Sequence, residues 1–438
     1  MMIRRNVKLL VLGAALVLAL PAVTSAQMSR VEGMALQGDY IKDWSGIFTY
    51  TSQVANVGNL VYGELGNVNS PPSTFDRSVG AVVGNLWEGR LGTWAVHLHE
   101  QQPNLGQGDA GSNGAPGTLG SDPNTNTMES FDIMWGKKFG TKSLGLRLNR
   151  SKGHNLVEQG SIFSFSQEYD FTAVDTNLAR NTMGFGAGLG FEVNPTTNAE
   201  ISLEYQKRDW KDETSNIFGL GQTTQFQSDG TATYLVAGRM MWQWQPNIMV
   251  VPVAKYYSYD LSEKYSVNQI PAGTIDNSLK GWQIGAAGNW TLGSNDLFVL
   301  GLTFAQNKLK QQRDVFGLST VPGLFVGDNS EITETLAPQL FAALETHVNS
   351  WLTLRFGANK GAFEKVKITN NDPAPVNPPI KQEITLSTFH MNLGAGLKFG
   401  NLQLDAVLDN QFPNHLPYFI SGDVTSNTFT KVTASYPW

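Results

Sequence analysis

The chain alternates apolar residues with polar or very small ones over most of its length. Residues 143–150, 200–208, 350–360 and 388–399 show this pattern most clearly. Large apolar side chains and alanine occupy one register, and hydroxyl, amide, charged or glycine residues occupy the other. Because successive side chains of a strand point to opposite faces, this period of two predicts strands with one continuous apolar face and one wet face.

The connections between these strands alternate between short and long. Short turns are predicted at residues 88–90, 140–142, 194–197, 245–247, 293–296, 349–350 and 400–401. Long polar loops are predicted at residues 101–127, 152–179, 211–229, 260–278, 309–330, 364–381 and 412–426. These connections separate fifteen strands. The first of them begins near Ser78 and runs toward a short turn, so an antiparallel strand must precede it in the chain. Residues 59–65 supply that partner and bring the total to sixteen.

An even number of strands with short turns at one end and long loops at the other is typical of a membrane barrel. Lipid cannot hydrogen-bond a backbone, so a sheet crosses a bilayer only if it closes and leaves no edge. We therefore predict an all-β fold: a transmembrane antiparallel up-and-down β-barrel over residues 59–438, with about sixteen strands and fourteen as the alternative.

Tryptophan placement supports this interpretation, because eight of the eleven tryptophans fall at the predicted short-turn rim. They are Trp87, Trp94, Trp135, Trp242, Trp244, Trp290, Trp351 and Trp438. Tryptophan favours the interface between lipid and water, so these side chains are predicted to form an aromatic girdle. The opposite girdle is predicted to contain Trp210, Trp282, Tyr256, Tyr257 and Tyr259. The alternative, aromatics in the core of a soluble sandwich, explains the clustering at one rim poorly.

The N-terminus has the features of a secretory signal peptide. Arg4, Arg5 and Lys8 precede an apolar run over residues 9–23, and small residues follow it. We predict that residues 1–26 are removed before Gln27. The alternative is a membrane anchor, but the apolar run is shorter than the roughly 20 residues that a spanning helix needs. Export without a spanning helix predicts the outer membrane of a Gram-negative cell as the destination.

Composition excludes several classes of protein. The 438-residue chain has no cysteine, which removes disulfide frameworks and thiolate chemistry. Its net charge of −6 argues against a nucleic-acid partner. His97 and His99 share a strand face, but two of six histidines reach this spacing easily by chance, and no nucleophile, zinc or phosphate-loop motif is present. We therefore expect neither an enzyme nor a metal or cofactor site.

The last strand resembles the C-terminal signal of bacterial outer-membrane proteins of the porin-like kind. One register carries Val432, Ala434, Tyr436 and Trp438, and the chain ends on the aromatic residue. This resemblance implies the barrel-assembly machinery as a partner, together with outer-membrane lipid. It leaves the oligomeric state open, and an oligomer is compatible with it.

A weaker resemblance concerns residues 27–58, after the predicted cleavage site. The spacing is similar to that of the segment that opens fatty-acid transporter (FadL-like) and PorV-like barrels, and the residues that carry it are Gly33, Met34, Asp43, Trp44, Ser45, Gly46, Ile47, Phe48, Val54 and Ala55. Residues 50–52 depart from the Asn-Pro-Ala of that family, and the predicted sixteen strands differ from its fourteen. The resemblance implies a periplasmic or luminal plug segment at residues 27–58.

Glycines on predicted inward registers give independent support for a plug. They are Gly184, Gly186, Gly188, Gly190, Gly285, Gly394 and Gly396. A residue without a side chain lets another backbone approach closely. The alternative is that these glycines only ease the curvature of the sheet.

Charged side chains of both signs are predicted to line the lumen. The pore-lining candidates are His97, His99, Asp132, Arg147, Glu192, Glu204, Arg208, Arg239, Glu345, Arg355, His390, Lys398, Asp405 and Asp409. Water-filled channels have such linings, and no single-sign ring is present, so we expect an outer-membrane channel for passive, weakly selective diffusion of small polar solutes. The first alternative is a FadL- or PorV-like barrel for hydrophobic ligand uptake or protein-export support. The second is a non-conducting structural or surface-display barrel.

Overall fold

The computed structural model describes residues 28–66, 77–84, 86–101, 128–157, 175–217, 222–293, 295–315, 329–370, 380–408 and 429–438. The predicted signal peptide and Asp409 lie outside these ranges. Four short helical elements come first: α2 (Met28–Glu32), η1 (Gly38–Tyr40), η2 (Trp44–Phe48) and η3 (Thr51–Asn56). No helix among the described residues is long and apolar enough to cross a membrane.

Everything after η3 that has regular structure is strand. The strands are β1 (Leu60–Leu65), β2 (Arg77–Val83), β3 (Thr93–Gln101), β4 (Met128–Phe139), β5 (Lys142–Val157), β6 (Asp175–Asn194), β7 (Thr197–Ile217), β8 (Gln222–Ser228), β9 (Ala232–Gln245), β10 (Ile248–Asp260), β11 (Glu263–Val267), β12 (Ile270–Leu292), β13 (Asp296–Val315), β14 (Asn329–His347), β15 (Leu352–Gly361), β16 (Glu364–Asn370), β17 (Ile380–Leu386), β18 (Phe389–Phe399), β19 (Leu402–Leu408) and β20 (Phe429–Pro437).

These strands form one closed antiparallel sheet. β1 pairs with β2 on one side and with β20 on the other, where Leu60 opposes Pro437 and Leu65 opposes Val432. Four strands of the barrel are each interrupted once, so that β8 continues into β9, β10 into β11, β15 into β16, and β17 into β18, and both pieces pair with the same neighbouring strand. The twenty segments therefore make sixteen strands around the barrel, which confirms the predicted fold and strand number.

The alternation of the sequence becomes an inside and an outside. Along β9, for example, Leu235, Ala237 and Arg239 are buried, whereas Tyr234 and Val236 are exposed. The exposed register is strongly apolar around the whole barrel, with large side chains such as Leu203, Ile284, Leu300 and Phe356 facing outward. Contact with water would cost about 25 cal/mol per Å² of this surface, so a lipid environment stabilises the sheet.

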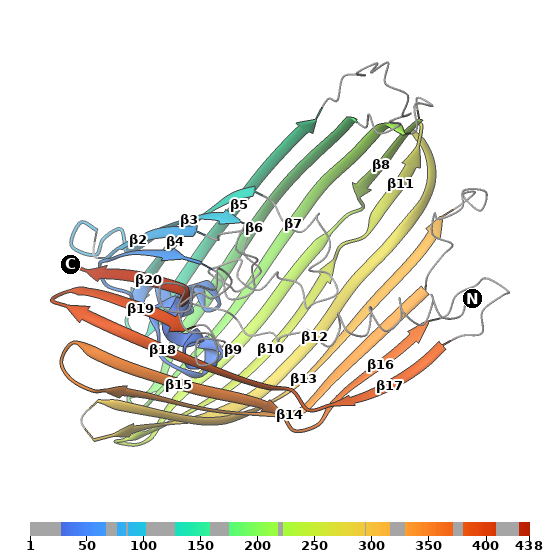
Figure 1. Ribbon diagram of the computed structural model, residues 1–438. Helices are drawn as coiled ribbons and strands as arrows, with labels where there is room; N and C mark the ends of the chain where they lie inside the picture. Colours follow the sequence, from blue (N-terminus) through green and yellow to red (C-terminus); the bar gives the residue numbers. More distant parts are fainter. Residues whose placement is uncertain are drawn as a thin grey trace, which may run out of the picture.

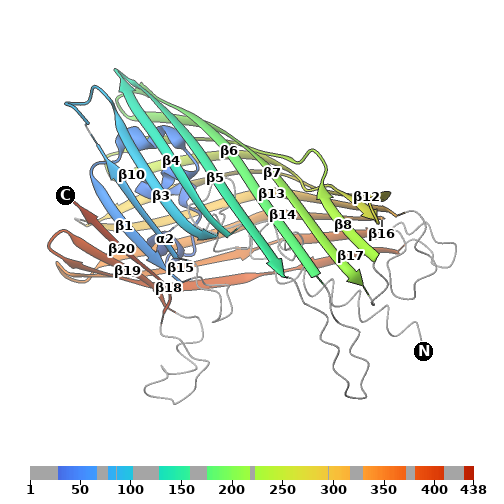
Figure 2. The same cartoon turned by 90° about the horizontal axis from the view of Figure 1, so that it is seen from above.

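The wall is much taller on one side than on the other. Strands β5–β7 and β12–β14 extend far beyond β1–β4 and β18–β20 (Figures 1 and 2). The predicted loops at residues 211–229 and 260–278 are wrong for this reason, because most of their residues form the ends of β7, β10 and β12 together with β8 and β11. The outward side chains there are polar or charged, as at Lys264, so the residues lack the apolar outer face of a membrane strand, although the backbone pairing continues.

The short-turn rim carries the predicted tryptophans. Trp87, Trp94, Trp242, Trp244, Trp351 and Trp438 are exposed there, and Trp135 and Trp290 are half-buried. In β20, Val432, Ala434 and Tyr436 alternate with the buried Lys431, Thr433 and Ser435, and Trp438 follows the end of the strand. Their roles at the membrane interface and in assembly stay predictions.

The opposite aromatic girdle is partly wrong. Trp282 and Tyr256 are exposed as predicted, but Trp210, Tyr257 and Tyr259 are buried inside the barrel. Trp210 continues the inward register of Glu204 and Arg208 in β7. The prediction failed because Tyr256, Tyr257 and Tyr259 were grouped by proximity, although adjacent residues of a strand face opposite sides.

The N-terminal segment, residues 28–58, lies inside the barrel at the short-turn end. Its helical turns are enclosed by the ring of strands, near the end where the C-terminus lies (Figure 1). Val31, Met34 and Tyr40 pack against the β10–β14 wall. Ile47, Phe48 and Val54 pack against residues of β1–β4.

Candidate functional site

Glycines in the wall receive the N-terminal segment. A β-carbon at Gly145 of β5 would overlap the carbonyl oxygen of Thr51, and one at Gly357 of β15 would overlap that of Met34. A β-carbon at Gly188 would lie 2.6 Å from the backbone nitrogen of Ser52. These contacts are possible only because glycine has no side chain.

The glycines predicted from the sequence divide into two groups. Gly188, Gly190, Gly285 and Gly394 face the N-terminal segment, through Ser52, Tyr40 and Gly33. Gly184, Gly186 and Gly396 instead face side chains of the wall. The glycine stripe of β6 therefore contacts the N-terminal segment over only half its length.

Replacing Gly145 by Val is expected to displace the N-terminal segment, because the new side chain would occupy the position of the Thr51 carbonyl. Overpacking of this kind costs about 1–3 kcal/mol. The measurement is trypsin cleavage after Lys42, which should accelerate in Gly145→Val. Gly63→Val is the matched control, because the nearest atom to a β-carbon there is the Ser78 carbonyl oxygen at 3.7 Å. Equal protection of Lys42 in both variants would contradict the expectation.

A first buried ion-pair network joins β3, β4, β5 and β7 below the centre of the lumen. Asp132 accepts a hydrogen bond from Arg147 Nε at 2.9 Å and lies 3.1 Å from His99 Nε2. Arg147 also reaches Glu204 at 3.2 Å and donates to the backbone oxygen of Phe48 at 3.0 Å. Four of the predicted lumen residues therefore meet in one cluster, and one arginine links that cluster to the N-terminal segment.

The two histidines of β3 belong to this cluster. The rings of His97 and His99 have centroids 3.7 Å apart, and His97 Nδ1 lies 2.7 Å from the hydroxyl of Tyr62. Both rings pack near Phe48. Within the described ranges, no group of three or more His, Asp and Glu residues is placed to hold a metal ion. The arrangement fits a structural role for the pair.

A second network joins the start of the N-terminal segment to β14, β15 and β19. Arg30 pairs with Asp43 at 2.6 Å and with Glu345 at 2.8 Å. Arg355 pairs with the same Glu345 at 2.6 Å and with Asp405 at 2.7 Å. Glu345, Arg355 and Asp405 were predicted to face the lumen, whereas Arg30 and Asp43 were missed because they lie outside the barrel strands.

Charge pairing stabilises this network against the cost of burial. Burial alone would raise the pKa of the Asp43 carboxyl, but Arg30 and the hydrogen bonds from Ser45 bring it below its ordinary value. Burial alone would likewise lower the pKa of Arg30, but Glu345 and Asp43 hold it above its ordinary value. Both groups are therefore charged when the N-terminal segment is in place.

Two further cations of the wall contact the N-terminal segment. Arg239 of β9 pairs with Glu200 at 2.8 Å, donates to the backbone oxygen of Asp39 at 2.9 Å and stacks on Tyr50 at 4.1 Å. Lys431 of β20 lies 3.2 Å from Glu32 of α2. The N-terminal segment is thus tied to the wall by cations on opposite sides of the barrel.

The remaining predicted lumen residues lie outside these clusters. Arg208 is buried and donates to Gln206 at 2.9 Å. His390 and Lys398 share the register of the buried Gly394 and Gly396 but are exposed. Glu192 is also exposed and lies at the short-turn rim.

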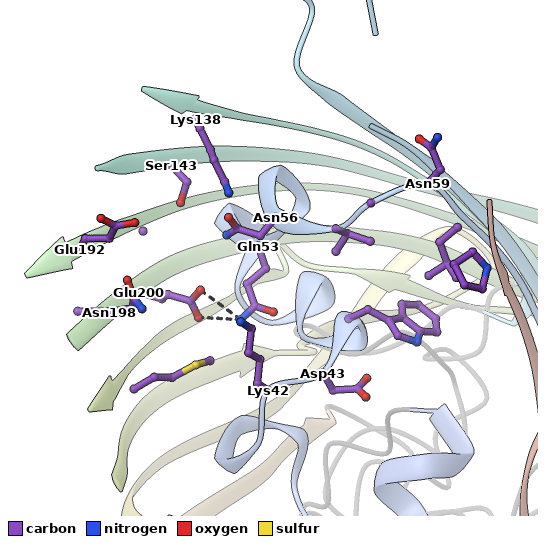
Figure 3. A pocket seen from close by; sticks show the side chains of 18 of the residues that line it. Lys42, Asp43, Gln53, Asn56, Asn59, Lys138, Ser143, Glu192, Asn198 and Glu200 are labelled. Carbon is purple, nitrogen blue, oxygen red and sulfur yellow. Dashed lines mark hydrogen bonds between the residues drawn. The ribbon is translucent and has the colours of Figure 1, made fainter. Parts of the chain in front are cut away.

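The short-turn rim holds a cavity of about 850 Å³ between the N-terminal segment and the wall. Lys42, Gln53 and Asn56 line it from the segment, and Lys138 and Glu192 line it from the strands (Figure 3). Most of the residues that line it are polar or charged, and both signs of charge are present. The cavity is the mouth of the barrel on the side of the segment that faces the short turns.

The long-loop half of the lumen has a different lining. Buried apolar side chains of β7, β9, β10, β12 and β13 form a cluster there, which consists of Trp210, Leu235, Tyr257, Tyr259, Leu261, Leu279 and Leu309, with Ile332 of β14 packed against it. We call this set the luminal apolar cluster. Part of it has a sequence signal, because the period of two places Leu235 on the same inward register as Arg239.

Comparisons with known proteins found similarity among solved structures. No protein-family model and no curated protein matches the chain. Among solved structures, a Pseudomonas aeruginosa FadL homologue is similar at 10% identity and a TM-score of 0.45, covering 94% of this chain and 98% of that one. The Ralstonia pickettii toluene transporter TbuX is similar at 11% identity and a TM-score of 0.38, covering 94% and 97%. With TM-scores this low, the fold assignment rests on the strand pairing described above.

Proposed function

We propose that the protein is an outer-membrane transport protein that admits small hydrophobic molecules through its long-loop end. The luminal apolar cluster carries this proposal. Its side chains are almost completely buried, so they form an apolar region inside the barrel. A polar solute gives up hydrogen bonds with water on entering such a region and a hydrophobic solute does not, so the cluster favours apolar ligands over polar ones.

The ion-pair network of the adjoining wall supports the same assignment. His99, Asp132 and Arg147 are already paired with one another, so their charges are neutralised within the wall. Paired charges attract a passing ion weakly. Passive diffusion of polar solutes was the main expectation from the sequence, and it relied on these same side chains as the lining of a water-filled channel.

Polar substitution within the luminal apolar cluster tests the proposal. In Leu235→Asn/Leu279→Asn, the affinity for a small aromatic probe such as naphthol is expected to fall by about tenfold, because each amide in the cluster lacks a partner. Binding is measured on the full chain in detergent by probe fluorescence. Leu235→Met/Leu279→Met is the matched control, because this change keeps the apolar volume. Naphthol binding by the Asn variant at wild-type affinity would contradict the proposal.

Passive diffusion of polar solutes remains the second candidate, because the rim cavity is polar and carries both charge signs. Planar-bilayer recording distinguishes the two functions. Stable open steps in the full chain without any hydrophobic ligand would favour the polar channel. Silence combined with probe binding would favour hydrophobic transport, and silence without binding would favour a structural barrel.

A further inference from the structure

A patch of lysines lies on the outer surface of the tall wall, beyond the apolar band. It consists of Lys280 in β12, Lys308 and Lys310 in β13, and Lys365 and Lys367 in β16, and we call it the outer lysine patch. All five side chains are exposed or half-buried. They continue the outward registers, which place Trp282 and Ile284 on β12 and Leu302 and Phe304 on β13 in contact with lipid.

Strand pairing brings these lysines together. Lys280 lies directly opposite Lys308, and Thr333 of β14 separates Lys308 from Lys367 in the same row. Neighbouring strands are about 4.8 Å apart, so one row of the patch spans about 14 Å. Like charges placed directly opposite one another in a sheet repel. The pair Lys280 and Lys308 therefore favours binding of an anion from outside the chain.

The chain supplies too few carboxylates for the patch. Glu331 pairs with Lys308 at 2.8 Å, although it lies directly opposite Lys310. Glu383 serves both Lys365 at 2.5 Å and Lys367 at 3.9 Å. Among the described residues, Lys280 and Lys310 have no ion-pair partner. Two carboxylates thus form ion pairs with three of the five ammonium groups, and Asp276 is a third carboxylate on the outward register of β12.

Three lysines elsewhere on the outer wall have acidic partners of their own. Lys207 pairs with Asp209 at 3.3 Å, and Lys211 pairs with Glu213 at 2.7 Å, both within β7. Lys264 of β11 pairs with Asp229 at 2.6 Å. Lys280 and Lys310 of the outer lysine patch differ from these three lysines in having no such partner among the described residues.

The outer lysine patch lies at the height of lipid head groups. From the short turn at residues 293–295 to Trp282, β12 contributes about ten residues, which at the usual tilt rise about 25 Å, the height of the apolar band of a membrane barrel. Lys280 is the next outward residue after Trp282, and Tyr256 lies directly opposite Trp282. Aromatic side chains followed by lysine mark the boundary between acyl chains and head groups.

We propose that the outer lysine patch binds the phosphorylated sugar head group of an outer-leaflet glycolipid, whose acyl chains lie along Ile284, Leu302 and Phe304. Ammonium groups form charge-assisted hydrogen bonds with phosphate oxygens. A row about 14 Å long accommodates a head group with more than one phosphate. The long loops place this end of the barrel in the outer leaflet. The inference is independent of what passes through the lumen.

The probe for this proposal is bisphosphorylated lipid A, titrated into the full chain in nonionic detergent and followed by native mass spectrometry. The wild type is expected to bind it more tightly than the same lipid with its phosphates removed. In Lys280→Gln/Lys308→Gln/Lys310→Gln, the Kd for lipid A is expected to rise by about tenfold or more. Lys280→Arg/Lys308→Arg/Lys310→Arg should retain binding, because it keeps the charge.

The matched control is Lys207→Gln/Lys211→Gln/Lys264→Gln, which removes three outward lysines that have acidic partners. Its Kd should stay within about twofold of wild type. In the unmodified protein, binding should weaken as salt rises, since exposed charges are screened. The proposal would be overturned if dephosphorylated lipid bound equally well, or if binding did not depend on salt. It would also be overturned if both triple glutamine variants lost binding equally.

Discussion

Deleting residues 28–58 is expected to turn a closed barrel into a conducting one. The segment fills the short-turn half through its apolar contacts, the glycine-lined wall and cations on several strands. Its removal leaves an inner face rich in charged and amide side chains, which water enters readily. The measurement is single-channel conductance in a planar bilayer. Residues 1–27 are retained so that the chain is still exported.

A reversible cross-link provides the control for this deletion. The hydroxyls of Ser29 and Thr433 lie 2.7 Å apart, and the chain contains no cysteine, so Ser29→Cys/Thr433→Cys introduces one disulfide between the segment and β20. The oxidised form should be as silent as the wild type. Stable conductance steps in the oxidised protein that are as large as those of the deletion variant would show that the segment does not close the barrel. A deletion variant that is folded, by heat-dependent migration on a gel, yet silent would show the same.

Replacing Asp132 by Ala is expected to lower the free energy of unfolding by about 3–5 kcal/mol, because it leaves a buried guanidinium without its principal partner. Asp132 and Arg147 are both almost completely buried, and the carboxylate contacts His99 as well. Glu204 remains 3.2 Å from Arg147, so the loss should lie toward the lower end of that range. Urea unfolding in lipid vesicles, followed by tryptophan fluorescence, measures it.

The exposed pair of Arg77 and Glu100 is the control for this prediction. Its atoms approach to 2.5 Å, closer than those of the buried pair, yet its side chains are 65% and 35% exposed. Water screens an exposed pair, so Glu100→Ala should leave the unfolding curve nearly unchanged. A similar loss in both variants would mean that burial does not control the strength of these ion pairs.

The sequence predicted the barrel well because lipid imposes a simple rule on it. Every outward position at membrane height must be apolar, and that requirement leaves a period of two in residues such as those of 350–360. The strand ends beyond the membrane were predicted poorly, as in residues 211–229 and 260–278. There the outward side chains are charged, as at Lys211 and Lys264, so the periodicity disappears although the hydrogen bonds persist.

The sequence predicted which residues of the candidate site face the lumen, but not which of them contact one another. Asp132, Arg147 and Glu204 were placed on inward registers, yet the sequence could not show that they form one cluster with Phe48. Arg30 and Asp43 escaped notice because a segment without periodicity carries no register. The luminal apolar cluster was missed because its side chains come from several strands and meet only in the folded barrel.

By itself, the sequence determined the alternation, the turn positions and hence the closed sixteen-strand cylinder, because each of these depends on neighbouring residues along one strand. Only the tertiary structure decided which inward charges pair, where residues 28–58 lie and which side of the lumen is apolar. Those features depend on strand tilt and on contacts between residues hundreds of positions apart, such as Ser29 with Thr433. Such contacts leave no pattern in the local sequence. The strand that carries a side chain determines whether it points inward, but the other strands determine which residues it contacts.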